Sequence, residues 1–396
     1  MKYWAVVWVF VALLNGCGGG GGSGGSSPSS PSGPNVLTVT IGQSAVCLFV
    51  NELCARVTIC QAGTTSCQTI SDVLVDIGST GLRIFGSVLT IPLSQQVDSQ
   101  GNPIGECAFF ADGTAFWGPV QQADVILGSE PAVNLPLQVI APTFAGQSSV
   151  QNPCNAPVDS SPGNSLLNGI LGVGLFAEDC GAVCATQNNN NLYFSCAIVT
   201  STCTGTTVSL VEQVQNPVML LPLDNNGLSI KLPNVPLTGA PSASGSLILG
   251  IGTTGNNMPP AGVSVLTTDQ SGFVTTFYKG AAFGQSVIDS GSNGLYFADA
   301  SLQAQDCGGQ LSGFYCPPNP VNLSATLVGA NNHQANISFQ VANTLALAQT
   351  GNAVFNNLGG QFPFFVWGIP FFLGQTTYVG FEGKTSSLGT GPLLAF

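Results

Sequence analysis

The amino-acid sequence predicts an all-β protein, and two observations support this class. Glycine and proline account for 51 and 25 of the 396 residues, and frequent Val, Thr, Ser and Asn favour short strands joined by tight turns. Short apolar runs separated by turn-forming residues follow one another along the chain. Helix signals are few, and only residues 343–356 (NTLALAQTGNAVFN) predict a short helix.

The predicted strands form two runs, separated by a polar, Asn-rich segment at residues 180–196. The first run covers residues 36–41, 73–77, 87–93, 123–128, 135–140 and 168–176. The second covers residues 218–223, 228–233, 244–252, 273–278, 286–292, 337–341, 365–372 and 376–381. The apolar run FFVWGIPFF at 364–372 is too short to cross a membrane, so we expect a buried pair of strands there.

Charge is scarce in this chain. Only 6% of residues are charged, Lys and Arg together number 6, and the formal net charge is −12. A nucleic-acid partner is therefore not expected, because phosphate binding needs clustered basic side chains. Few carboxylate ion pairs can be lost on acidification, which predicts tolerance of mildly acidic conditions.

The N-terminus has the pattern of an export signal. One Lys precedes a short apolar run, and LNGC at residues 14–17 resembles the lipobox of bacterial lipoproteins, in which Cys17 becomes the lipidated first residue. We therefore predict a lipoprotein signal peptide at 1–17 and a protein held in the bacterial cell envelope, at the outer membrane, the periplasmic face or the cell surface. Plain secretion is the alternative.

A flexible tether is predicted to follow. Residues 18–35 are rich in Gly, Ser and Pro and would hold a folded body away from a membrane surface, although a leader without an anchoring role has the same composition. We place an N-terminal lobe at 36–250 and a C-terminal lobe at 251–396.

The cysteine pattern predicts disulfides. Thirteen cysteines are present, and an even number remains without Cys17, as expected in an oxidising compartment. A zinc site is disfavoured because His333 is the only histidine and paired C-x-x-C motifs are lacking. Cys307 and Cys316 alone follow residue 205, so this is the one pairing that we predict. We expect no metal and no cofactor.

One acidic turn is written twice, as VDIGSTG from Val75 and IDSGSNG from Ile288. Each aspartate, Asp76 or Asp289, ends a predicted buried strand. The glycine two residues later lets backbone N–H groups approach the carboxylate, and the next serine can donate its hydroxyl to it. The supporting residues are Gly78, Ser79, Ser290, Gly291 and Ser292.

Two such turns predict a pair if the halves of the chain face each other about a pseudo-twofold axis. Carboxylates about 3 Å apart cannot both ionise, so they share one proton, and one acts as base toward water while the other acts as acid. The alternative is that Asp76 and Asp289 each merely cap a β-turn.

These turns and three further elements resemble pepsin-like aspartic peptidases over about residues 36–396. The family motif hydrophobic-hydrophobic-D-[ST]-G-[ST] is matched at 74–79 and 287–292, and its later hydrophobic-hydrophobic-Gly is matched by ILG at 170–172 and VWG at 366–368. GSLILGIG from Gly245 resembles the strand that bridges the lobes. The chain is also similar to uncharacterised bacterial exported lipoproteins with paired D-x-G-S turns.

The resemblance implies a bilobal fold with pseudo-twofold lobes and an interlobe cleft, in which Asp76 and Asp289 are catalytic. It also implies a flap over the substrate, matched by FADGT with Phe110, Asp112 and Gly113.

Three positions depart from the family. A hydroxyl residue after each Asp bonds across to the opposite lobe. Ser290 can do this but Ile77 cannot, and an unpaired buried backbone group costs about 1–3 kcal/mol. The flap Tyr is replaced by Phe110. The Trp that supports it is replaced by Arg83, for which we considered a pairing with Asp112 or a place in solvent.

Three functions are compatible with the sequence. The first is a surface-tethered aspartic peptidase that cuts extended peptide or protein substrates; we expect a monomer whose only membrane contact is through Cys17. The alternative is a catalytically impaired pepsin-like lipoprotein that binds peptide or glycan or has a structural role in the envelope. A third is an adhesin-like module whose two carboxylates lie more than about 6 Å apart, outside pairing range.

Overall fold

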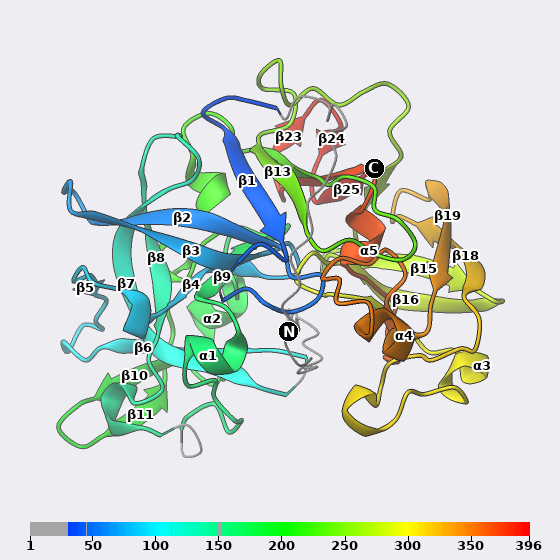
Figure 1. The fold of residues 1–396 in the computed structure, drawn as a ribbon. Coiled ribbons are helices and arrows are strands. Elements are labelled where there is room, and N and C mark those ends of the chain that lie inside the picture. Colours follow the sequence, from blue (N-terminus) through cyan, green and yellow to red (C-terminus); the bar gives the residue numbers. More distant parts are fainter. Residues whose placement is uncertain (1–30, 45, 112, 149–151) are drawn as a thin grey trace.

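The computed structural model describes residues 31–44, 46–111, 113–148 and 152–396 (Figure 1). These residues form an all-β protein, as predicted, and its longest helices have 5 residues. No helix in these ranges is long and apolar enough to span a membrane.

Most strands of the first half of the chain lie together, on the left in Figure 1. We call these strands the first strand group. They are β2 (Cys54–Gln61), β3 (Cys67–Asp76), β4 (Thr80–Phe85), β5 (Ser94–Gln95), β6 (Ile104–Phe109), β7 (Ala115–Ile126), β8 (Val133–Ile140), β9 (Gly169–Val173), β10 (Tyr193–Ala197) and β11 (Thr202–Gly205).

A separate seven-stranded sheet lies on the right in Figure 1 and forms the second strand group. Its strands are β15 (Val274–Tyr278), β16 (Ala281–Ile288), β17 (Leu295–Tyr296), β18 (Val321–Val328), β19 (Gln334–Val341), β20 (Gly359–Gly360) and β21 (Val366–Trp367).

The remaining long strands extend the first sheet. They are β1 (Val36–Ile41), β12 (Gly227–Lys231), β13 (Ala243–Leu249), β14 (Val265–Thr267), β22 (Thr376–Gly380) and β25 (Leu393–Ala395). From β2 outward, the order of strands in the sheet is β1, β13, β12, β22, β25 and β14. A small hairpin of β23 (Thr385–Ser386) and β24 (Gly389–Thr390) stands apart. Because β12 pairs with both β13 and β22, one sheet takes strands from both sides of residue 250.

Both strand groups contain the same motif. In the first, β9 lies between β3, to which it is parallel, and β4, to which it is antiparallel. In the second, β21 lies between β16 and β17 in the same two senses. Each inserted strand contains or is followed by a glycine that no larger residue could replace. A Cβ on Gly172, in β9, would lie 2.7 Å from the Gly81 carbonyl oxygen, and one on Gly368, after β21, would lie 2.4 Å from the Ser292 carbonyl oxygen. The ILG segment (170–172) and the VWG segment (366–368) therefore pack directly against the backbone that follows each aspartate.

The helices are short, and they correct several predicted elements. They are α1 (Pro162–Ser165), α2 (Ala182–Thr186), α3 (Ala300–Gln303), α4 (Thr344–Ala348) and α5 (Ile369–Phe372). The predicted helix at 343–356 ends at Ala348, after which Val354 pairs with Ala240. The predicted strand pair at 364–372 is one short strand followed by α5, whose first turn contains Pro370.

Two further predicted strands are wrong. Residues 87–93 contain the end of a 3-10 turn (Gly86–Val88) and irregular chain, where Pro92 provides no N–H for a ladder. Residues 218–223 begin in the 3-10 turn Pro217–Leu220, where the Asn216 side chain accepts a hydrogen bond from the Val218 N–H. In both segments the local 3-10 turn replaces the strand that the apolar pattern predicts.

The disulfides are local. The bonded cysteines pair two by two in sequence order: Cys47–Cys54, Cys60–Cys67, Cys107–Cys154, Cys180–Cys184, Cys196–Cys203 and Cys307–Cys316. The predicted Cys307–Cys316 pairing is confirmed. Six disulfides are typical of proteins in the extracellular or periplasmic space.

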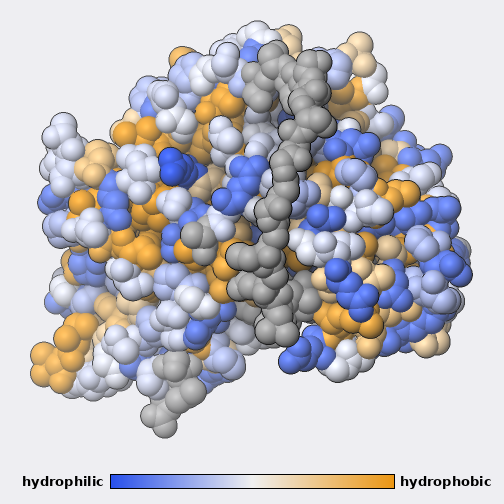
Figure 2. Space-filling view, viewed as in Figure 1, coloured by the Kyte–Doolittle hydropathy of each residue, from blue (hydrophilic) through white to orange (hydrophobic). Residues whose placement is uncertain are grey.

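One large hydrophobic cluster runs through both strand groups and the strands between them, and Ile77 belongs to it. On the face seen in Figure 2, hydrophobic residues reach the surface in several separate places among polar ones. His333 is exposed, directly before β19.

Candidate active site

The two aspartate turns meet at the junction of the strand groups. Asp76 ends β3, Asp289 follows β16, and each carboxylate lies against the glycine of the opposite turn. A Cβ on Gly78 would lie 2.6 Å from Asp289 Oδ1, and one on Gly291 would lie 2.7 Å from Asp76 Oδ1. Each glycine therefore leaves the space that the carboxylate of the other turn occupies. This contact excludes the adhesin-like arrangement with separated carboxylates.

Each carboxylate is also fixed within its own turn. Gly78 N–H donates to Asp76 Oδ1 at 2.7 Å, and the Ser79 hydroxyl donates to Asp76 Oδ2. In the second turn, Gly291 N–H and the Ser292 hydroxyl donate to the two Asp289 oxygens at 2.8 and 2.6 Å. Gly78 and Ser79 in the first turn thus make the same contacts as Gly291 and Ser292 in the second.

Burial changes the acidity of the pair. It raises the pKa of Asp76 well above its ordinary value, and the charge and hydrogen bond of Asp289 raise it further. Burial also raises the pKa of Asp289, while its hydrogen bonds with Asp76 and Ser292 oppose the shift. Two buried carboxyl groups in contact titrate as a unit and retain one proton between them over part of the pH range.

A single hydroxyl connects the turns directly. Ser290 Oγ donates to the Val75 carbonyl oxygen at 2.8 Å and accepts from the Ile77 N–H at 3.1 Å. The Ile77 side chain is buried in the main hydrophobic cluster and makes no reciprocal bond. The first turn is therefore held by the second, and the tie that a hydroxyl at position 77 would add is absent.

The expected flap is the turn between β6 and β7. Phe110 N–H donates to the Thr114 carbonyl oxygen at 2.9 Å, and Gly113 N–H donates to that of Phe110 at 3.1 Å. The Phe110 ring packs edge-on against Phe116, at 4.6 Å between centroids. Asp112 and Cys17 lie outside the described residues, so their predicted roles are not placed.

The flap turn reaches both strand groups. Phe110 is buried in a cluster with Leu74 and Ile170, close to the strand that carries Asp76. Ala111 packs against a different cluster, which contains Tyr296 and Phe355 of the second half. Substrate covering by Phe110 and Gly113 remains a prediction.

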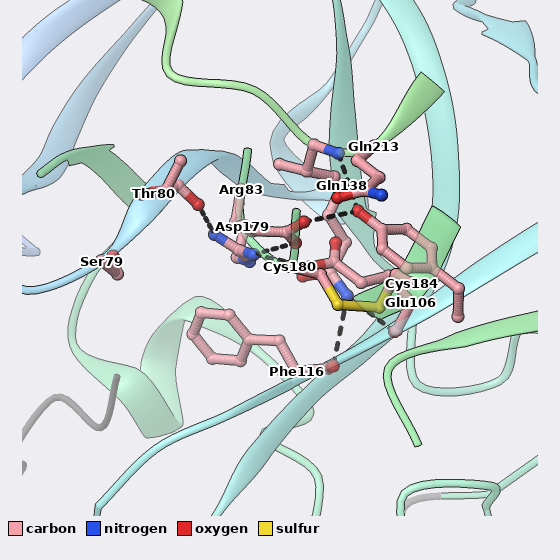
Figure 3. A network of polar contacts seen from close by, with 12 residues as sticks. Ser79, Thr80, Arg83, Glu106, Phe116, Gln138, Asp179, Cys180, Cys184 and Gln213 are labelled. Carbon is pink, nitrogen blue, oxygen red and sulfur yellow. Dashed lines mark hydrogen bonds and ion pairs between the residues drawn. A yellow bond between two sulfur atoms is a disulfide. The ribbon is translucent and has the colours of Figure 1, made fainter. Parts of the chain in front are cut away.

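Arg83 lies in a buried polar network, shown in Figure 3, which corrects its predicted place in solvent. Its Nη2 lies 2.5 Å from Glu106 Oε1 and 3.0 Å from Asp179 Oδ2, and Nη1 donates to the Thr80 carbonyl oxygen at 2.7 Å. Glu106 belongs to β6, so the guanidinium connects the strand after the Asp76 turn to the flap hairpin.

Two acidic residues of this network were missed from the sequence. Burial raises the pKa of Asp179 well above its ordinary value, and the nearby Glu106 carboxylate adds to the shift, while Arg83 lowers it. The Tyr193 hydroxyl donates to Asp179 Oδ1 at 2.7 Å. A usable signal existed for Glu106, because a lone acid in the apolar strand IGECAF of so weakly charged a chain needs a buried partner.

Within the described ranges, one group of three side chains is close enough together to hold a metal ion, namely Cys47, Glu52 and Cys54. Cys47 and Cys54 are bonded to each other, so they provide no thiolate to hold a metal ion. The aspartate pair lies elsewhere and has its own hydrogen-bond donors.

The fold and the site define a class: an all-β, disulfide-rich protein with a buried, hydrogen-bonded pair of aspartates at the junction of its strand groups. Residues 31–396 match the family described as Protein of unknown function (DUF3443), and the chain belongs to this family. No curated protein matches the chain at a significant level.

Proposed function

We propose that this protein is a bilobal, pepsin-like aspartic peptidase, exported and held in the bacterial cell envelope by a lipid on Cys17. The observation that carries the proposal is the close approach of the Asp76 and Asp289 carboxylates across Gly78 and Gly291, with each carboxylate oriented by the glycine N–H and serine hydroxyl of its own turn. The first and second strand groups would be the cores of the two lobes. The bilobal proposal is supported by the strand motif that the two groups share, in which β9 lies beside β3 and β21 lies beside β16.

The proposed reaction needs no cofactor. One carboxyl group of the pair is ionised and takes a proton from a water molecule, while the other donates its proton to the carbonyl oxygen of the substrate. The water oxygen bonds to the carbonyl carbon and gives a tetrahedral diol. On collapse of the diol the C–N bond breaks, the now ionised carboxylate takes the proton of one diol hydroxyl, and the other carboxyl group donates its proton to the amine nitrogen. The proposed substrate is an extended peptide, and the turn between β6 and β7 is the candidate flap that would cover it.

The test is proteolysis by the full-length protein in detergent. Wild type, Asp76→Asn, Asp289→Asn and Asp269→Asn are incubated with an unfolded protein between about pH 3 and 7, the range in which a shared carboxyl proton titrates. Asp269 is the matched control, because it is exposed and its carboxylate accepts hydrogen bonds from the backbone of its own turn, at Ser271 and Phe273. We expect cleavage by wild type and Asp269→Asn only. Equal behaviour of wild type and both pair variants would refute the enzyme.

One observation favours a second function, that of a catalytically impaired protein. Residue 77 is a buried isoleucine, whereas the family resemblance calls for a hydroxyl that bonds across to the other turn. In this reading the pepsin-like lipoprotein binds peptide or glycan without turnover or serves the envelope structurally. The substitution Ile77→Thr separates the two. Strong new proteolysis by Ile77→Thr, absent from the unaltered protein, would support the impaired protein, and robust cleavage by the unaltered protein would rule it out.

A further inference from the structure

The loop between β1 and β2 contacts both aspartate turns. The Cys47–Cys54 disulfide closes the second half of this loop, and both cysteines are buried. Near its end, the Leu53 carbonyl oxygen accepts a hydrogen bond of 2.8 Å from the N–H of Val75, the residue before Asp76. The closed loop is thus fixed to the strand that carries the first aspartate.

Asn51, two residues earlier in the loop, reaches the second half of the molecule. Its Nδ2 donates at 2.8 Å to the carbonyl oxygens of Asn293 and Phe355, and its Oδ1 accepts from the Phe355 N–H at 2.7 Å. Its own N–H donates to the Ala353 carbonyl oxygen at 2.8 Å. The side chain is buried, and both amide hydrogens and the oxygen are used.

The position of Asn293 gives these contacts their meaning. Asn293 directly follows Ser292, whose hydroxyl orients the Asp289 carboxylate. A bond to the Asn293 carbonyl therefore restrains the backbone immediately after the second turn. Val50, beside Asn51, adds an apolar contact to a cluster that contains Tyr296 and Phe355.

We propose that Asn51 is a positioning residue, which holds the Asp289 turn against the Asp76 turn in place of the hydroxyl that Ile77 lacks. Ser290 ties the second turn to the first, and the Asn51 carboxamide ties the first half back to the second. The residue does not contact the carboxylates; it acts through the backbone at Asn293. The expected effect on catalysis rests on the proposed function, whereas the effect on the carboxyl pair does not.

The substitution Asn51→Gly tests this with little backbone strain. Asn51 has φ 61°, which glycine adopts freely, so this change removes the carboxamide and keeps the turn. Asn332→Gly is the matched control, since Asn332 has φ 60° and is exposed in the turn before β19. Asn51→Asp, which keeps the size and the acceptor while losing both donors, serves if the glycine variant does not fold.

Two measurements decide the result. In an active enzyme we expect Asn51→Gly to lower kcat by about 10- to 100-fold with little change in KM, as for a misplaced catalytic group, and Asn332→Gly to match wild type. Independently of activity, carbon NMR titration of the aspartate side chains, assigned with Asp76→Asn and Asp289→Asn, follows the proton shared by the pair. We expect the separation between the two titration steps to shrink in Asn51→Gly.

The outcomes remain separable if no proteolysis is found. If the wild type cleaves nothing, the proposed function is refuted, and the NMR titration alone then tests whether Asn51 positions the aspartate pair. Titration of the pair that is the same in Asn51→Gly, Asn332→Gly and wild type would overturn the inference. Reduced coupling in the Asn51 variants alone would support it.

Discussion

Ser290 Oγ lies 3.1 Å from the Ile77 amide nitrogen and 2.8 Å from the Val75 carbonyl oxygen, so one hydroxyl bonds to the backbone on both sides of Asp76. The bonds are buried, and no water competes for them without opening the junction of the strand groups. The alignment of the two carboxyl groups therefore depends on a small number of atoms, and this makes it open to test.

Removing that hydroxyl should destabilise the protein. Ser290→Ala leaves the Ile77 N–H and the Val75 carbonyl without their partner, at about 1–3 kcal/mol for each buried group left unpaired. Ser286→Ala is the control, because Ser286 is equally buried and its hydroxyl bonds only to nearby Phe283. Urea unfolding of both variants measures the difference, and an equal loss of stability would contradict the cross-turn role.

A methyl group on Gly78 should separate the carboxyl groups. Its Cβ would lie 2.6 Å from Asp289 Oδ1, so Gly78→Ala should cost about 1–3 kcal/mol by overpacking and weaken the coupled titration of the pair. Gly284→Ala, in the strand before Asp289, meets no atom within 4 Å and should change stability by less than about 0.5 kcal/mol. Similar unfolding free energies for the two would show that the turns do not meet closely.

Arg83 should matter more than an ion pair near the surface. Arg83→Met leaves Glu106 and Asp179 buried without their cation, which should cost about 3–5 kcal/mol at neutral pH. Lys279→Met removes a half-exposed partner of Asp299 and should cost less than about 1 kcal/mol. Urea unfolding at pH 7 compares the two, and a small effect of Arg83→Met would mean that the network relaxes or admits water.

Stability should be greatest at mildly acidic pH. Burial raises the pKa of Glu52, Asp76, Asp179 and Asp289. A raised pKa stabilises the fold while the group keeps its proton, fully so below the ordinary value near about 4, and this contribution is lost as pH rises through the folded-state pKa. The thermal midpoint should therefore rise as pH falls from 7 toward about 4.

The same series has a lower limit and an internal control. Hydrogen bonds from Ser195 and Asn102 lower the pKa of Asp98 to about 2, so its contribution is lost as pH falls from about 4 to about 2. Glu52→Gln should flatten the rise between neutral and mildly acidic pH, whereas Glu212→Gln, at an exposed position, should not. A midpoint that is constant from pH 7 to 4 would contradict the burial of these acids.

Features written in adjacent residues could be predicted from the sequence. The D-x-G-S turns contain the donors for their own carboxylates within three residues, and Cys307 with Cys316 is a local pair. The all-β class follows from turn residues between apolar runs. Apolar runs alone do not distinguish a strand from a buried helix, which is why residues 364–372 were assigned wrongly.

Contacts between distant segments could not be predicted. Arg83 meets Glu106 and Asp179 from segments 23 and 96 residues away, and Asn51 meets Asn293 at a separation of 242. Nothing local marks these side chains as partners. Asn51 reads as an ordinary turn residue, and only the packing of the two strand groups brings it to the second turn.

The order of the disulfides has a consequence for how the protein matures. The described cysteines are bonded two by two in sequence order, with separations of 7, 7, 47, 4, 7 and 9 residues. A chain that enters an oxidising compartment N-terminus first presents each thiol's native partner before any later competitor. With Cys17 blocked, oxidation in the order of entry would favour the native connectivity, so we expect little need for shuffling by an isomerase.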